Sequence, residues 1–587
     1  MTNVHNRPGT SLNGYWKYIV DPYENGFYNY RYQPFEEQEN PGNGAFFTNA
    51  KRQSKADLIE YNFDLMDSLV VPADWNTQKE RLFYYEGSVW YKKSFDYKKS
   101  ADKNRVFLYF GGANYKSDVY LNGKKLGSHI GGFTPFQFEI SHLLKSKDNY
   151  LILKVDNQRK KEGVPTLNTD WWNYGGITRD VKLIETPGTY VHSYHLNLSA
   201  KSPDRIEGIV KVKGEQRAKF SVDVRIPELG LHKRLKTDKN GFVSFDFKTT
   251  GLEHWSPENP KLYSVQISTA SEELIEKIGF RTIKTEGANI LLNGKSIFLR
   301  GISIHEESPV RGGRANTPED AIKLLQWAKE LGCNYVRLAH YPHNEHMLRE
   351  ADRLGLLVWE EIPVYWTIDW ENPETYQNAQ DQLASVIERD QNRASVIVWS
   401  MANETPNSPS RNAFLRKLAA FTRTKDPSRL ISAALEQQSI KADPFTRTIS
   451  DPFAEVVDLL SFNQYIGWYD GGIEKCQKIQ WKIPFDKPVI ISEFGAGAKY
   501  GLLGPKDERW TEDYQEYLYA ETLKMLDKID QFRGVSPWIL VDFKSPRRVL
   551  PEVQDNYNRK GLISEKGEKK KAFYTLQGFY AKKKAED

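Results

Sequence analysis

The sequence has little cysteine, no long apolar run and almost no excess of charge. Two cysteines, Cys333 and Cys476, in 587 residues exclude a fold that depends on several disulfides. Cys333 falls between a predicted helix and a predicted strand, where we expect it to be a small buried apolar residue. No segment approaches the ~20 apolar residues that a membrane-spanning helix needs. The net charge of +5, from 82 basic and 77 acidic residues, gives no basis for nucleic-acid binding.

The N-terminal residues also lack the features of a secretion signal. Residues 1–7 contain no apolar core of the kind that a signal peptide requires. We therefore expect a cytoplasmic location by default, and a periplasmic one if a leader has been removed.

The composition is that of a globular protein, with 39% hydrophobic and 27% charged residues. A chain of this length needs more than one hydrophobic core, so we expect several domains. Residues 1–187 are rich in aromatic residues and contain short alternating runs at 105–110, 117–121 and 150–155. Asn122-Gly123 between two such runs is a hairpin signal. This region is predicted to be a β-sandwich.

Residues 188–283 continue in short strands with alternating apolar residues. Runs at 208–212, 220–225, 242–247 and 262–267 carry this pattern. About ninety residues of this kind are typical of an immunoglobulin-like sandwich.

From residue 284 to 587 the pattern changes, because apolar strands now alternate with helical segments. Thr317, Pro318 and Asp320 form a helix start, Gly332 ends that helix, and similar signals bound helices near 344–355 and 513–529. Eight strands in about 300 residues predict a (β/α)₈ barrel. The predicted strands are 297–304, 334–338, 356–360, 395–401, 430–435, 457–462, 488–493 and 535–541.

Two glutamates end apolar strands of this predicted barrel. Glu404 follows the fourth strand and Glu493 ends the seventh. Active sites of such barrels form where the strands end, so the two carboxylates are expected to meet across the mouth. A pair of this kind can supply the acid and the nucleophile that break a glycosidic bond.

Three histidines spaced by three residues raise the alternative of a metal site. His340, His343 and His346 have this spacing, but Pro342 interrupts a common helix face and no acidic ligand follows at helical spacing. We therefore predict neither a metal nor another cofactor.

The residues around the two glutamates resemble glycoside hydrolase family 2, and the likeness covers nearly the whole chain. One stretch that matches is 334–342 with Asp352 and 355–359, and the other is 390–404. Leu338 and Gln391 depart from the usual pattern. The resemblance implies a sandwich, an immunoglobulin-like domain and a catalytic barrel in that order.

The same resemblance implies roles for individual residues. Glu404 corresponds to the acid/base and Glu493 to the nucleophile of a retaining mechanism. Glu493 must then be ionised while Glu404 holds a proton, and the charge of the first raises the pKa of the second. Asn403 corresponds to the residue that binds the sugar 2-hydroxyl, Tyr465 to a tyrosine that hydrogen-bonds the nucleophile, and His340 to a ligand of a substrate hydroxyl.

Near the C-terminus, Asn558 and Lys560 resemble the β-glucuronidase signature that binds the C6 carboxylate of a uronic acid. A carboxylate that loses its hydration needs a cation and a donor in return. Tyr469 corresponds to a tyrosine that contacts this carboxylate, Asp170 to an aspartate that reaches sugar hydroxyls, and Trp538 to a tryptophan under the ring.

Three departures concern the surroundings of this pocket. Gln464 stands where an arginine is common, and the long loop at 543–558 holds Arg547 and Arg548, which can add charge for a second acidic sugar. The short stretch at 366–390 favours an open site for oligosaccharides.

The sequence thus favours a retaining exo-β-glucuronidase that acts on uronic-acid glycosides. Three alternatives stay open: a β-galacturonidase, a β-galactosidase with the same machinery, and a carbohydrate-binding protein without catalysis. Members of the family often form dimers or tetramers, so a homo-oligomer also stays open.

Overall fold

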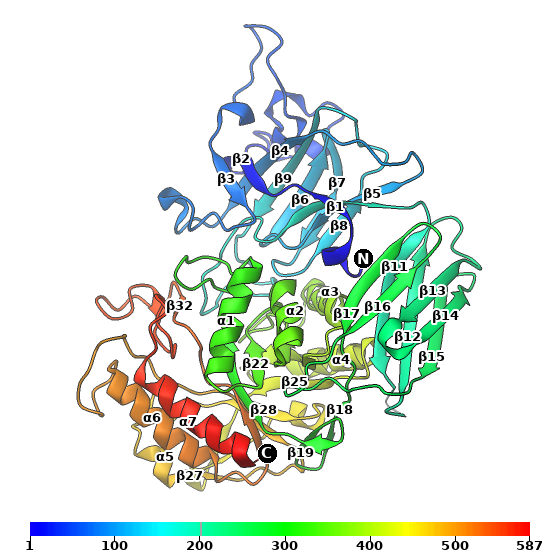
Figure 1. Cartoon of the computed structure of the whole chain (residues 1–587). Helices are drawn as coiled ribbons and strands as arrows, with labels where there is room; N and C mark the ends of the chain where they lie inside the picture. Colours follow the sequence, from blue (N-terminus) through cyan, green and yellow to red (C-terminus); the bar gives the residue numbers. More distant parts are fainter. Residues whose placement is uncertain (200–201, 587) are drawn as a thin grey trace.

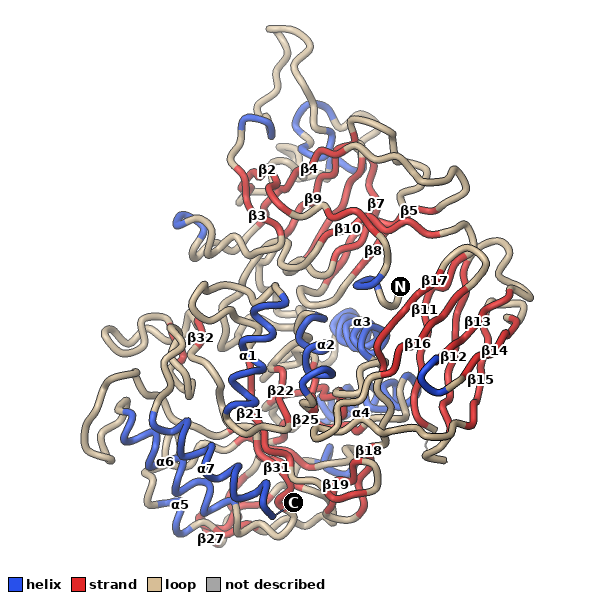
Figure 2. The backbone as a smooth tube through the Cα atoms, viewed as in Figure 1, coloured by secondary structure: helices blue, strands red, loops and turns tan. Residues whose placement is uncertain are grey.

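The computed structural model of the protein describes residues 1–199 and 202–586. Figure 1 shows a first sandwich at the top, a second sandwich at the right, and a barrel with its helices below them. In Figure 2 the long helices belong to the barrel, whereas the two sandwiches consist of strands and loops with only short helical turns. Within the described residues, no helix is long and apolar enough to cross a membrane.

The first sandwich consists of two antiparallel sheets, with strand orders β1-β10-β5-β8 and β3-β2-β4-β9-β6-β7. The hairpin signal at Asn122-Gly123 is confirmed, because both residues have positive φ and join β6 to β7. The strands are β1 Gly9–Ser11, β2 Gly14–Asp21, β3 Ser68–Val71, β4 Ser88–Phe95, β5 Arg105–Phe110, β6 Lys116–Leu121, β7 Lys124–Ile130, β8 Phe136–Glu139, β9 Asn149–Asp156 and β10 Val181–Thr186.

The second sandwich packs a three-stranded sheet, β11-β12-β15, on a four-stranded sheet, β14-β13-β16-β17. In β15, buried residues alternate with exposed ones, as expected for a strand with one face on the core. The strands are β11 Tyr190–Leu198, β12 Arg205–Lys213, β13 Ser221–Ile226, β14 Leu231–Lys236, β15 Phe242–Lys248, β16 Tyr263–Ser268 and β17 Glu273–Ile278.

Eight parallel strands then close a barrel in the order β21-β22-β23-β24-β25-β28-β30-β31. The predicted barrel is therefore confirmed, and seven of its strands lie where the sequence placed them. The strands are β21 Leu299–Ile304, β22 Tyr335–Leu338, β23 Leu357–Glu361, β24 Val396–Asn403, β25 Leu430–Leu435, β28 Leu460–Asn463, β30 Val489–Glu493 and β31 Phe532–Val535.

The prediction of the eighth strand at 535–541 is wrong, because β31 ends at Val535. The following residues are as apolar as a strand, but Pro537 has no N–H to donate to a neighbouring strand. The backbone instead makes isolated hydrogen bonds, from Trp538 N to Phe494 O at 2.9 Å and from Leu540 N to Ser303 O at 3.0 Å. This irregular segment carries Trp538 across the barrel mouth.

The first two helices around the barrel, α1 and α2, start and end at signals in the sequence. Thr317 and Asp320 form a complete capping box on α1, and Gly355 ends α2 with a φ of 70°. The helices are α1 Pro318–Glu330, α2 Glu345–Leu354, α3 Pro373–Asp390, α4 Pro409–Lys425, α5 Lys475–Lys478, α6 Glu512–Leu526 and α7 Lys571–Glu586.

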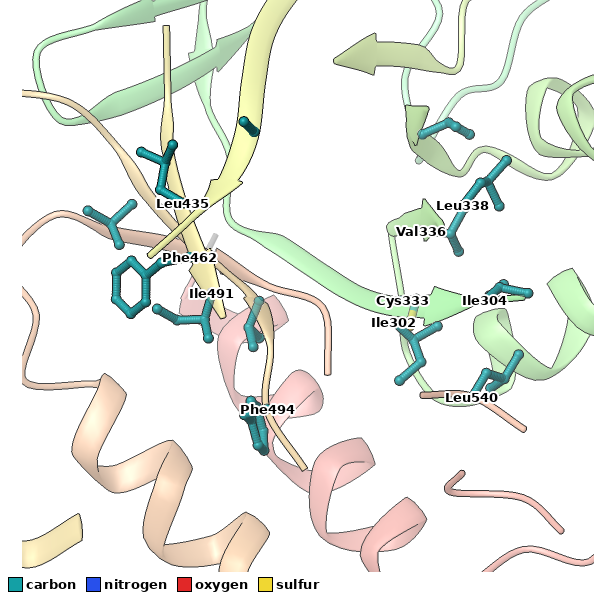
Figure 3. Packing of buried hydrophobic residues seen from close by; sticks show 14 of the residues in the cluster. Ile302, Ile304, Cys333, Val336, Leu338, Leu435, Phe462, Ile491, Phe494 and Leu540 are labelled. Carbon is teal, nitrogen blue, oxygen red and sulfur yellow. The ribbon is translucent and has the colours of Figure 1, made fainter. Parts of the chain in front are cut away.

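Alternate residues of the barrel strands face opposite sides. Val336 and Leu338 of β22 belong to the core between strands and helices, and Figure 3 shows them beside Ile302 and Ile304 of β21. Cys333 is buried in the same core, as predicted. Below the barrel, a small sheet of β18 Ile283–Glu286, β19 Asn289–Leu292 and β20 Lys295–Ser296 contributes to the cluster that fills the barrel interior. The opposite end, where the strands finish, holds the polar groups described next.

Candidate active site

Glu404 and Glu493 lie at the carboxyl ends of the fourth and seventh strands of the barrel. Glu493 is the last residue of β30, and Glu404 directly follows Asn403, the last residue of β24. Glu404 has a φ of 48°, in the left-handed region that residues with a Cβ rarely adopt. Such a backbone conformation is common at functional sites, where the surrounding structure enforces it.

Two donors hold the carboxylate of Glu493. Arg337 Nη1 donates to Oε1 at 2.7 Å, and the hydroxyl of Tyr465 donates to Oε2 at 2.7 Å. Burial and the charges of Glu493 and Glu404 raise the pKa of Tyr465 well above its ordinary value, so this hydroxyl keeps its proton. These two hydrogen bonds fix the orientation of the Glu493 carboxylate.

Arg337 is fully buried on β22 and organises the floor of the site. Its guanidinium also contacts both carboxylate oxygens of Glu361 at 3.1–3.2 Å and Asn403 Oδ1 at 2.7 Å. Burial opposes the charge of Glu361, but Arg337 and the bonded His340 outweigh it and lower the pKa of that carboxyl. One guanidinium thus stands between two carboxylates, which leaves a net negative charge under the site.

The environment of Glu404 differs from that of Glu493, because burial and a neighbouring carboxylate act against its charge. Burial, followed by the negative charge of Glu493, raises the pKa of the Glu404 carboxyl to about 7. The indole of Trp366 donates to Oε2 of Glu404 at 3.0 Å. The two glutamates therefore differ as an acid and a nucleophile must: Glu404 holds a proton near neutral pH, while Glu493 faces a guanidinium.

Asn403 and His340 complete the wall between the two glutamates. Asn403 accepts from Arg337, while its own Nδ2 is buried and has no partner among the described residues, so it remains a free donor. His340 Nδ1 lies 2.7 Å from Glu361 Oε1, and its Nε2 lies 3.7 Å from Glu493 Oε1. The ring of Trp538 stacks on His340 at 4.7 Å between centroids.

Lys560 provides a buried cation beside these groups. Its side chain is almost fully buried, and its Nζ donates to the hydroxyl of Tyr469 at 2.7 Å. The rings of Tyr465, Trp468 and Tyr469 surround the ammonium at 4.7–5.7 Å. Among the described residues no carboxylate forms a salt bridge with it, and burial lowers its pKa below the ordinary value. A buried ammonium that forms no salt bridge is costly unless a ligand supplies the anion.

Asp170 reaches this pocket from the first sandwich. Its carboxylate accepts from Ser545 Oγ at 2.6 Å, from Arg548 Nε at 3.0 Å and from Asn558 Nδ2 at 3.1 Å. The Oδ1 of Asn558 in turn accepts from the backbone N–H of Lys560 at 3.1 Å. In this structure Asp170 therefore ties Asn558 and Arg548 together.

The structure thus brings every predicted site residue to one end of the barrel. Three further contributors were not assigned a role from sequence: Arg337, Glu361 and Trp366. Glu361 carried a usable signal, because it ends an apolar strand as Glu493 does. Arg337 carried a weaker one, since an arginine inside a buried strand needs partners.

The three histidines considered for a metal do not converge. His340 faces Glu361, whereas His343 Nε2 lies 3.0 Å from the backbone oxygen of Ala339 and His346 lies beside His5. Within residues 1–199 and 202–586, no group of three histidine, cysteine or acidic side chains is arranged to hold a metal ion.

Gln464 is also buried at the site. Its Oε1 accepts from the backbone of Ile466 at 3.0 Å, and its Nε2 has no partner among the described residues. A neutral amide donor thus stands where the family commonly has an arginine, so any additional positive charge must come from elsewhere. Arg548 places a cation beside Asp170.

Comparisons with known proteins agree with this architecture. Among proteins of known sequence, the β-glucuronidase of Paenibacillus borealis is 28% identical over 562 residues, which cover 86% of this chain and 90% of that protein. Among solved structures, a β-glucuronidase of an uncultured Clostridium sp. superimposes with a TM-score of 0.82 at 24% identity, covering 99% of each chain. A family 2 β-galacturonidase from Eisenbergiella tayi, bound to glycerol, gives a TM-score of 0.78 at 25% identity, covering 98% of this chain and 96% of that one.

Three family models together match almost the whole chain. The sugar binding domain of glycosyl hydrolases family 2 matches residues 10–187, a second domain of the same family matches residues 189–281, and its TIM barrel domain matches residues 283–582. With the barrel and the two glutamates at its mouth, these matches lead to one conclusion: the chain belongs to glycosyl hydrolases family 2.

Proposed function

We propose that the protein is a retaining exo-β-glucuronidase, which removes terminal β-linked glucuronic acid. The observation that carries this proposal is the buried ammonium of Lys560, which forms no salt bridge with a carboxylate among the described residues. Beside it, the amide of Asn558 and the hydroxyl of Tyr469 supply polar groups for a C6 carboxylate. A neutral sugar would leave the lysine buried and unpaired.

The proposed reaction is a double displacement. The carboxylate of Glu493, fixed by Arg337 and Tyr465, attacks the anomeric carbon while Glu404 gives its proton to the leaving oxygen. A covalent glycosyl-enzyme forms, and the charge of Glu493 is lost. Glu404, now ionised, accepts a proton from water, which attacks the same carbon and releases the sugar with its configuration retained.

The groups under the sugar ring support the charged transition state. The anomeric carbon gains positive character as the glycosidic bond breaks. The net negative charge of Glu361 and Glu493 around Arg337 lies below that position and stabilises it. The free Nδ2 of Asn403 is placed to donate to the 2-hydroxyl.

A β-galacturonide is the second candidate substrate. It carries the same C6 carboxylate and differs only at C4, and a family 2 β-galacturonidase superimposes on the chain at 25% identity. The deciding experiment compares kcat/KM for p-nitrophenyl β-glucuronide, β-galacturonide and β-galactoside. We expect the glucuronide to be the best substrate and the galactoside the poorest. A galactoside turned over faster than both uronides would refute the role given to Lys560.

The pKa of Glu404 predicts the alkaline side of the pH profile. Because Glu404 must be protonated to act as the acid, kcat/KM should fall as the pH rises through about 7. A glucuronide with an alkyl leaving group should show this limb most clearly, since its oxygen needs the proton. The measurement is the pH profile of kcat/KM for methyl β-glucuronide.

The control for this profile is Glu404→Gln, measured beside the wild type on p-nitrophenyl β-glucuronide, whose good leaving group lets the variant turn over. The alkaline limb near pH 7 should disappear in this variant. If the limb persists unchanged, it belongs to another group and Glu404 is not the acid.

A further inference from the structure

The side of the site that receives the leaving group is marked by Trp366. Glu404, as the proposed acid, must face the oxygen of the leaving group. Trp366 lies next to it, because its indole nitrogen donates to Glu404 Oε2 at 3.0 Å. The residues that contact Trp366 therefore lie close to the leaving group.

Arg547 covers the ring of Trp366. The guanidinium carbon lies 4.8 Å from the ring centroid, and Nη1 donates to the side-chain oxygen of Asn168. Arg547 is exposed, and among the described residues no carboxylate forms a salt bridge with it. Trp366 and Asn168 thus hold the Arg547 guanidinium in position, and no carboxylate of the described residues neutralises it.

The loop that carries Arg547 is anchored to the first sandwich. On one side of Arg547, Ser545 donates to Asp170, and on the other side Arg548 binds the same carboxylate with two nitrogens. Bidentate pairs between arginine and carboxylate fix geometry as well as charge. The position of Arg547 relative to the site is therefore set by its neighbours in sequence.

Arg547 is the cation nearest to the proposed acid on the side of the leaving group. Arg548 is already paired with Asp170, and Lys560 lies on the side of the proposed C6 carboxylate. Arg547 instead lies over Trp366, which donates to Glu404. It is therefore the charged group that can contact an anion on the departing unit.

We propose that the subsite for the leaving group takes a sugar unit that bears an anionic group, a carboxylate or a sulfate ester, which Arg547 binds. A planar guanidinium matches the paired oxygens of either group. This inference rests on the proposed function, because it takes Glu404 as the acid. It makes the preferred substrate an acidic oligosaccharide with at least two charged units.

The test uses three glucuronides that share one linkage and differ only in the second sugar, which is neutral, carboxylated or sulfated. The ratio of kcat/KM for an anionic over the neutral substrate should exceed one in the wild type and fall about tenfold in Arg547→Ala. Arg547→Lys should retain part of the preference. Because Arg547 is exposed, added salt should weaken the preference in the wild type. The carboxylated and sulfated substrates identify which anion is preferred.

Arg416→Ala is the matched control, since Arg416 lies on the outer helix α4 and pairs with Glu455 there. Its ratio should equal that of the wild type. A wild-type ratio near one, or an unchanged ratio in Arg547→Ala, would refute the anionic subsite while glucuronide hydrolysis continued. Failure to hydrolyse any glucuronide would refute both the proposed function and this inference.

Discussion

Replacing Glu493 with glutamine should lower kcat by at least about 10⁴-fold, because the variant has no carboxylate to form the covalent intermediate. The amide is nearly the same size and keeps an oxygen toward Arg337, so the fold should be preserved. Steady-state kinetics with p-nitrophenyl β-glucuronide measure the loss, and the thermal midpoint checks the fold. Glu508→Gln, an exposed glutamate outside the site, should behave as the wild type.

Small anions separate the roles of the two glutamates. In Glu493→Gly, azide can enter the space of the missing carboxylate and should give the α-glucuronyl azide in one displacement. In Glu404→Gly, azide should attack the glycosyl-enzyme and give the β-azide. Nuclear magnetic resonance of the products distinguishes the two configurations. The opposite assignment of products would exchange the roles of nucleophile and acid.

Replacing Lys560 with alanine should lower kcat/KM for the uronide by about 10²- to 10⁴-fold, because removing one partner of a buried charge pair costs about 3–5 kcal/mol. The loss should be selective. The p-nitrophenyl β-galactoside has no carboxylate to leave unpaired, so its kcat/KM should change far less. The measurement is therefore the ratio of kcat/KM for the uronide over kcat/KM for the galactoside.

Stability gives an independent check on Lys560. In the unliganded protein the ammonium is buried among aromatic rings, and no carboxylate of the described residues forms a salt bridge with it. Lys560→Met should therefore raise the free energy of unfolding by about 1 kcal/mol or more. Lys566→Ala replaces an exposed lysine of the same segment. It should change neither the ratio of kcat/KM for the uronide over the galactoside nor the free energy of unfolding. Equal losses on uronide and galactoside, with a lower thermal midpoint, would make Lys560 a structural residue instead.

Local patterns were enough to predict the barrel and its two principal carboxylates. The strands around Glu404 and Glu493 are continuous apolar runs, and a carboxylate at the end of such a run stands out. Glu361 also stands at the end of an apolar strand. It is preceded by Glu360, which faces the opposite way and accepts from Arg389. Sequence spacing alone could not say which of the two points inward.

Other features depend on contacts that no local pattern encodes. The eighth strand was misplaced because residues 535–541 are buried for a different reason: they carry Trp538 over the mouth. Arg337 meets Glu493 from a strand 156 residues away, and Arg548 meets Asp170 across 378 residues. Such pairings follow from closing the barrel and docking the sandwich on it.

The contact of Asp170 with Ser545, Arg548 and Asn558 has a consequence for protein engineering. A chimera that combined this barrel with the first sandwich of a relative would keep Glu404 and Glu493. The loop that carries Arg547 and Arg548 would lose its contact with Asp170. Selectivity should then degrade before turnover does. Exchanges between relatives should therefore move residues 168–170 together with residues 543–560, as one inherited unit.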